Sequence, residues 1–99
     1  MRKYELMTVF PVEDAQFQPG IEELRSILKS FNVNVVQEEP FGDRDLCYEI
    51  RKNKKGRYTL FNIEADPSCM LELNKRFKLI PQMLTYLFVK IEEKATKSR

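Results

Sequence analysis

The sequence predicts an α+β domain in which two helices cover one face of a four-stranded antiparallel sheet. Two observations lead to it: strand and helix patterns follow the order β-α-β-β-α-β, and each helical segment has a single apolar stripe. The simplest packing of two such helices is on one sheet face, the ferredoxin-like arrangement. A chain of 99 residues suits one such domain. We expect residues 1–92 to form it and the charged residues 93–99 to form a flexible tail.

The first strand is expected over residues 2–10, which are rich in β-formers and end at Pro11. Apolar residues occur on both of its alternating sides, so the strand should be central in the sheet. The first helix is expected to open at Pro19-Gly20 and to stop near Asn32. Its apolar stripe comprises Ile21, Leu24, Leu28 and Phe31.

A long hairpin is expected in the centre of the chain. The second strand should start at residues 33–37, bend at 38–42 near Gly42, and resume where Leu46, Tyr48 and Ile50 alternate with polar neighbours. Residues 51–57 contain five cations and are expected to form a basic turn. The third strand then begins at Tyr58, and its core face should comprise Thr59, Phe61, Ile63 and Ala65.

The second helix should start at Asp66-Pro67, an N-cap carboxylate followed by proline at the first helical position. Pro81 prevents its continuation. The last strand is expected over residues 83–91. Its near-continuous apolar run is typical of a strand with both faces covered.

Composition argues against several classes of function. The chain has no histidine and only three glycines, so neither an ordinary general acid–base site nor a phosphate-cradling glycine loop is expected, and catalysis is disfavoured. Two separate cysteines, Cys47 and Cys69, predict neither a zinc site nor a disulfide. No apolar run has the length of a membrane span. We expect a cytoplasmic protein with no metal, no cofactor and no small-molecule substrate.

The stretch around Tyr48 resembles the signature of the bacterial small-subunit ribosomal protein S6 family. The matching residues are Gly42, Arg44, Asp45, Leu46, Cys47, Tyr48, Ile50 and Arg51. Cys47 stands where the family more often has alanine or serine, and cysteine is also a small hydrophobe. The resemblance extends from Arg2 to about Lys90. It implies the ferredoxin-like fold and a non-catalytic role in the ribosome, where the family pairs with ribosomal protein S18 and binds the central domain of small-subunit rRNA.

Two sets of candidate site residues follow. One sheet face lacks helices, and large apolar groups on such a face mark an interaction surface. Its members are Met7, Val9, Tyr58 and Leu60. By the resemblance they would contact S18. The second set carries the charges that neutralise phosphates, and one aromatic ring that could stack on a base. Its members are Arg2, Lys3, Tyr4, Arg44, Lys54, Lys55 and Arg57.

Some of these residues have other readings. Tyr4 is equally compatible with the edge of the core, Arg44 with an ion pair to Asp43 or Asp45, and the basic turn with solvent. The family often has an arginine early in the last strand, where this sequence has Thr85, so an RNA contact at that position is not expected here.

Three alternative functions share this fold. The first is an autonomous RNA-recognition motif, whose sheet signature requires an aromatic residue where the sequence has Arg57. The second is a homo-oligomeric domain that binds a small ligand between sheets. The third is a small acyl-phosphate hydrolase, for which the carboxylates near residues 38–45 lack catalytic partners.

Overall fold

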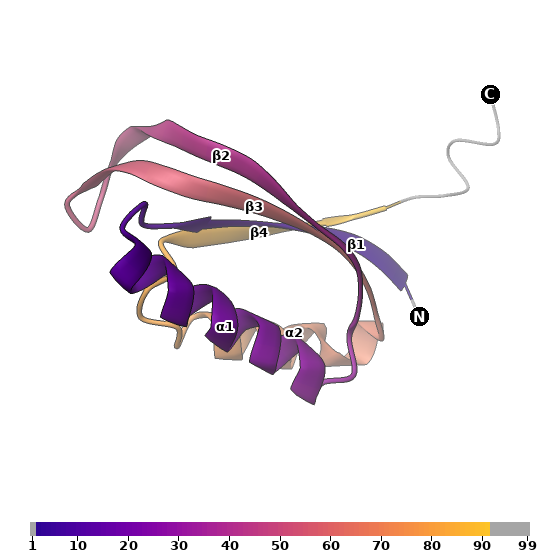
Figure 1. Cartoon of the computed structure of the whole chain (residues 1–99). Coiled ribbons are helices and arrows are strands. Elements are labelled where there is room, and N and C mark those ends of the chain that lie inside the picture. The colour runs from indigo at the N-terminus through magenta and orange to yellow at the C-terminus, as the bar shows by residue number, and fades with distance from the viewer. Residues whose placement is uncertain (1, 92–99) are drawn as a thin grey trace, which may run out of the picture.

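The computed structural model describes residues 2–91, and the expected tail at residues 93–99 lies outside them. The described elements, in chain order, are β1 (Arg2–Phe10), α1 (Asp14–Ser30), β2 (Asn34–Ile50), β3 (Asn53–Ala65), the 3₁₀ turn η1 (Pro67–Cys69), α2 (Met70–Phe77) and β4 (Thr85–Lys90). The strands pair antiparallel in the order β2-β3-β1-β4. Both helices lie on one side of the sheet (Figure 1). The predicted ferredoxin-like architecture is confirmed.

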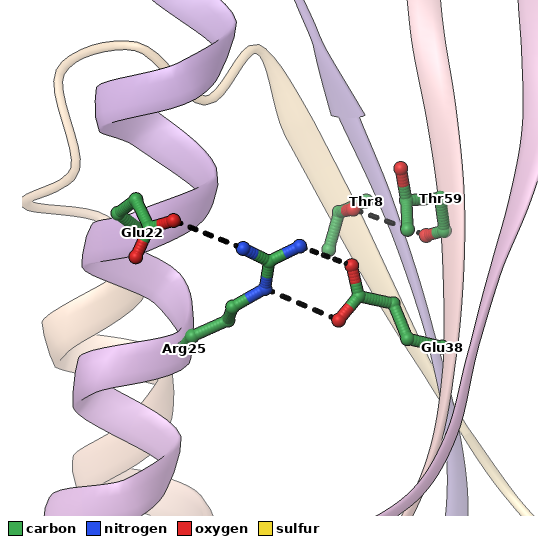
Figure 2. Close-up of polar contacts among 5 residues, drawn as sticks. All are labelled: Thr8, Glu22, Arg25, Glu38 and Thr59. Carbon is green, nitrogen blue, oxygen red and sulfur yellow. Dashed lines mark hydrogen bonds and ion pairs between the residues drawn. The ribbon is translucent and has the colours of Figure 1, made fainter.

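The core lies between the helices and the sheet. Alternate residues of β1 and β3 point into it, including Leu6 and the predicted core face of β3. Two threonines are also buried there, and the Thr8 hydroxyl donates to the carbonyl oxygen of Thr59 at 3.0 Å (Figure 2). This bond satisfies a polar group that would otherwise be costly to bury.

Helix α1 begins at Asp14, so the expectation that it opens at Pro19 is wrong. The backbone N–H of Phe17 already donates to the carbonyl oxygen of Glu13 at 2.8 Å. Pro19 therefore lies inside the helix and cannot donate the corresponding bond. Phe17 packs edge-on against Phe10, with ring centroids 5.8 Å apart, and this contact favours the longer helix.

The hairpin turn is shorter than the sequence suggested. It comprises only Arg51 and Lys52, both in the left-handed region with φ values of 49° and 68°. Two successive positive φ values are the mark of a type I′ hairpin turn. The Asn53 side chain supports this turn by donating to the carbonyl oxygens of Ile50 and Arg51. The remaining cations of residues 51–57 are therefore strand residues of β3.

The bend expected at residues 38–42 is an irregularity in a continuous strand. The β2–β3 register shifts between Pro40 and Gly42, and Gly42 has φ 87°. A residue without Cβ adopts this conformation without strain, so glycine suits the position. The predicted cap at Asp66-Pro67 is confirmed, because the Asp66 carboxylate accepts a bond from the backbone N–H of Ser68 at 3.0 Å. The cap opens the 3₁₀ turn η1, and α2 follows it from Met70.

Candidate RNA and protein interfaces

A set of apolar side chains occupies the sheet face that has no helices. We call it the outer face and define it by Met7, Tyr58, Leu60, Leu87 and Val89. Met7 pairs with Leu60 on one side and with Leu87 on the other, so these three side chains form a row across β3, β1 and β4. Leu87 is 62% exposed and Val89 is 46% exposed. A contiguous apolar surface of this kind is typical of a protein–protein contact.

Leu87 and Val89 were missed by the sequence reasoning. The apolar run around them predicted a strand covered on both faces, but only its helix-facing side, with Tyr86 and Phe88, packs against the core. The expectation that both faces are covered is therefore wrong. The alternation of side chains along a strand could have indicated their exposure, because residues 87 and 89 point to the face opposite Tyr86 and Phe88.

Val9 differs from the other predicted interface residues. It is on the helix-free side but only 3% exposed. The hairpin approaches it closely: a Cβ atom added at Gly56 would lie 2.4 Å from Val9 Cγ1 and 3.2 Å from Leu46 Cδ2. Val9 is thus buried against the part of the hairpin that contains Gly56. It is not available to a partner in the way the sequence suggested.

Arg57, one of the predicted RNA-binding residues, is paired with two carboxylates of the protein itself. Its guanidinium donates to the Asp43 carboxylate at 2.9 and 3.2 Å and to Asp14 at 2.9 Å. The guanidinium also lies over the Phe17 ring, 4.8 Å from its centroid. These hydrogen bonds, foremost the one with Asp43, raise the pKa of Arg57 above its usual range and lower the pKa of Asp43. Arg57 therefore holds the hairpin against α1.

Arg44 is exposed on β2 beside the hairpin. The alternative considered for it, an ion pair with Asp43 or Asp45, does not form within residues 2–91, and Asp43 is bonded to Arg57 instead. Its side chain instead donates to the carbonyl oxygen of Phe41 at 3.3 Å and lies over the Phe41 ring. Lys54 and Lys55 are exposed on β3.

The remaining candidates lie at the start of β1. Arg2 and Lys3 are exposed there, at the end of the sheet opposite the hairpin tip (Figure 1). The predicted cations are thus divided between two ends of the molecule. Tyr4 is only 8% exposed and packs edge-on with Phe88. Of the two alternatives for Tyr4, the structure therefore supports the core residue. Its ring is buried and is not exposed for stacking on a base.

Arg25 was not singled out by sequence, and it joins the two layers. Figure 2 shows its side chain reaching from α1 toward β2, between Glu22 of its own helix and Glu38 of the strand. The hydrogen bonds to Glu38 are the main reason that the pKa of Arg25 is raised. This cation is paired with two carboxylates and is therefore a poor candidate for an RNA phosphate.

Other kinds of site find no support in the part of the chain that the structure describes. Residues 2–91 contain no group of three or more histidine, cysteine or acidic side chains placed to hold a metal ion. Cys47 and Cys69 are both free thiols. None of the described helices combines the length and the apolar character needed to cross a membrane.

Comparison with known proteins decides the family. The model of the family described as ribosomal protein S6 matches residues 3–90. The chain belongs to the ribosomal protein S6 family. This membership confirms the family resemblance that the residues around Tyr48 indicated. Its relatives are named as ribosomal proteins rather than enzymes, which agrees with the expected non-catalytic role.

Three curated relatives are similar to this chain over nearly its whole length. The small ribosomal subunit protein bS6 of Treponema denticola is 69% identical over 93 residues, covering 94% of this chain and 100% of the relative. That of Treponema pallidum strain Nichols is 36% identical over 92 residues, covering 93% and 99%. That of Halalkalibacterium halodurans is 34% identical over 95 residues, covering 94% and 100%.

Solved structures agree on the fold. The crystal structure of a 30S ribosomal protein S6 from Thermotoga maritima matches with a TM-score of 0.82 at 23% identity, covering 99% of this chain and 94% of that one. The C-terminal domain of the MgtC protein from Mycobacterium tuberculosis also matches, with a TM-score of 0.61 at 8% identity, covering 94% and 90%. Because a differently named protein shares the architecture, the sequence match rather than the fold identifies the S6 family.

Proposed function

We propose that this chain is a structural constituent of the bacterial small ribosomal subunit in the cytoplasm, where it binds central-domain rRNA together with ribosomal protein S18. The observation that carries the proposal is the outer face, on which Leu87 and Val89 remain exposed beside Met7 and Leu60. No described helix covers this face (Figure 1). A partner that buried it would remove apolar surface from water, which is the main favourable term in protein association.

S18 is the proposed occupant of the outer face. The support is the membership of the S6 family together with the character of the surface, which has an apolar centre and charged neighbours such as Glu5, opposite Val89, and Glu39, opposite Leu60. Tyr58 is the single aromatic residue of that set. An RNA-recognition motif stacks two or three bases on sheet aromatics, so the outer face favours a protein partner over autonomous base recognition.

The RNA contacts are proposed for exposed cations that lie beyond the two ends of the outer face. Lys54, Lys55 and Arg44 lie on the hairpin, while Arg2 and Lys3 lie at the start of β1. Exposed lysine and arginine side chains neutralise phosphates and release counterions without reading sequence. Arg57 contributes indirectly, because its bonds to Asp43 and Asp14 position the strand that carries Lys54 and Lys55.

Leucine truncation on the two faces tests the protein contact. We expect the change Leu87→Ala to weaken S18 binding by about tenfold or more, since burying a leucine side chain is worth roughly 1.5–3 kcal/mol. Because Leu87 is 62% exposed, the fold should lose little stability. Binding of purified S18 is measured by calorimetry, and urea unfolding is measured in parallel.

Leu71→Ala is the matched control, since Leu71 is 70% exposed on α2, in the helical layer. It should leave S18 affinity unchanged. Equal affinities for the wild-type protein and the Leu87→Ala variant would refute the outer face as the S18 site. Concentration-dependent self-association of the chain, lost in Leu87→Ala, would instead favour a homo-oligomer.

A further inference from the structure

A hollow of about 190 Å³ lies where the hairpin tip meets the segment between α2 and β4. The buried residues Ile80 and Met83 contribute apolar atoms to its lining. Its polar lining includes Arg51, Lys78 and Thr85. Figure 1 shows the hairpin tip and this segment at the same end of the molecule.

Arg51 is held in place at this hollow. One guanidinium nitrogen, Nη1, donates to the carbonyl oxygen of Pro81 at 2.6 Å. The type I′ turn fixes the backbone of Arg51, and the Asn53 side chain bonds to two carbonyl oxygens of that turn. Within residues 2–91 the other N–H groups of Arg51 have no partner. The side chain is therefore oriented while most of its donors remain available.

The positive charge of the hollow is not compensated. Lys78 is exposed, and its ammonium group makes no ion pair within residues 2–91. No carboxylate lines the hollow. By contrast, the larger hollow beside Arg25 contains a guanidinium already paired with Glu22 and Glu38. The hollow therefore combines an oriented guanidinium, that of Arg51, with an unpaired ammonium, that of Lys78, and no acid in its lining. Such a pair of cations forms a site for an anion.

We propose that this hollow binds a phosphate group of the RNA backbone, held by Arg51 and Lys78 with the Thr85 hydroxyl as a further donor. The proposal rests on the proposed function, since it names one RNA contact of the same chain. A planar guanidinium suits a phosphate because it can donate two parallel hydrogen bonds. The hollow lies at the hairpin end of the molecule, so an RNA strand that contacts Lys54 and Lys55 passes close to it.

The anion site is tested first without RNA. The full chain is titrated with inorganic phosphate, and the backbone amide resonances of Lys78 and Thr85 are followed by NMR. Both resonances should shift in the wild-type protein, and Lys78→Gln should bind phosphate about tenfold more weakly. The exposed Lys78 side chain makes no hydrogen bond or ion pair within residues 2–91, so this variant should leave the fold intact.

Lys75→Gln is the matched control, because Lys75 is an exposed cation of α2 that does not line the hollow. It should bind phosphate like the wild-type protein. Arg51→Lys, which keeps the charge, should retain more of the response than Arg51→Gln. Absent shifts, or equal losses in Lys75→Gln and Lys78→Gln, would overturn the anion site.

RNA binding then identifies the source of the phosphate. With S18 present, Lys78→Gln should reduce the slope of log affinity against log salt by about one relative to the wild-type protein and Lys75→Gln. An unchanged slope would overturn the hollow as an RNA contact while leaving the proposed function standing. Failure of the wild-type protein to bind central-domain RNA would overturn both.

Discussion

Arg57 and Lys55 lie on the same strand, but their charges have different surroundings. Lys55 is exposed to solvent, whereas the Arg57 side chain is only 27% exposed and bonded to carboxylates of α1 and β2. The sequence showed a basic segment and could not show which of its cations is neutralised. That depends on Asp14, which is distant in sequence and reaches Arg57 only because α1 begins before Pro19.

The Asp43–Arg57 pair predicts a specific pH dependence. The pKa of Asp43 is lowered in the folded protein, chiefly by the hydrogen bond from Arg57. Its stabilising contribution is therefore fully present above the unfolded-state pKa of about 4 and is lost as pH falls through the lower folded value. The variant Asp43→Asn should be less stable than the wild-type protein at pH 7, and the difference should vanish toward pH 2. Urea unfolding across this range measures it.

Asp45→Asn provides the comparison, because the Asp45 carboxylate has no partner within residues 2–91. Its stability should follow that of the wild-type protein at pH 7. A difference between the wild-type protein and Asp43→Asn that stayed constant down to pH 2 would show that the lost stability does not come from the ionised carboxylate.

At the scale of elements, the hairpin formed by β2 and β3 departs most from expectation. Its turn lacks the Asn-Gly or Asp-Gly signal of a type I′ turn, so the sequence predicted a basic loop over residues 51–57, whereas β3 already begins at Asn53. The strands themselves were predictable, since alternation and the special role of Gly42 are local properties. The burial of Val9 was not, because it depends on the close approach of Gly56 from the neighbouring strand.

This approach predicts the effect of a methyl group at Gly56. The variant Gly56→Ala should destabilise the fold by about 1–3 kcal/mol, because its Cβ would meet Val9 Cγ1 at 2.4 Å. The free energy of unfolding in urea measures the loss. In a Val9→Ala background the same change should cost less, since the crowded methyl group is gone. Equal costs in the two backgrounds would show that Gly56 does not support close packing against β1.

Strand β4 shows a further limit of pattern reading. Its apolar run carried too little polar contrast to reveal which side faces the core. Among the described strands, β4 lies at one edge of the sheet and pairs with β1 alone. The exposure of Leu87 and Val89 follows from that position and from the location of both helices on the other face.

For the whole molecule, order and architecture were predictable because each segment carried its own period and boundaries. The distribution of function over the surface was less so. The sequence grouped Arg2 and Lys3 with the hairpin cations, yet these sets lie at opposite ends of the sheet (Figure 1). The apolar outer face lies between them. The proposed protein contact thus lies at the centre of the sheet, and the proposed RNA contacts lie at its two ends.

The most direct measurement is the affinity for a central-domain rRNA fragment over a salt series, for this chain alone, S18 alone and the two together. Joint binding predicts tight capture only by the mixture, with a steep salt dependence. Replacing Lys54 and Lys55 by alanine should reduce the log–log slope by about one to two. Equally tight binding by this chain alone would contradict joint binding, and a mixture that bound no more tightly than S18 alone would remove this chain from the RNA contact.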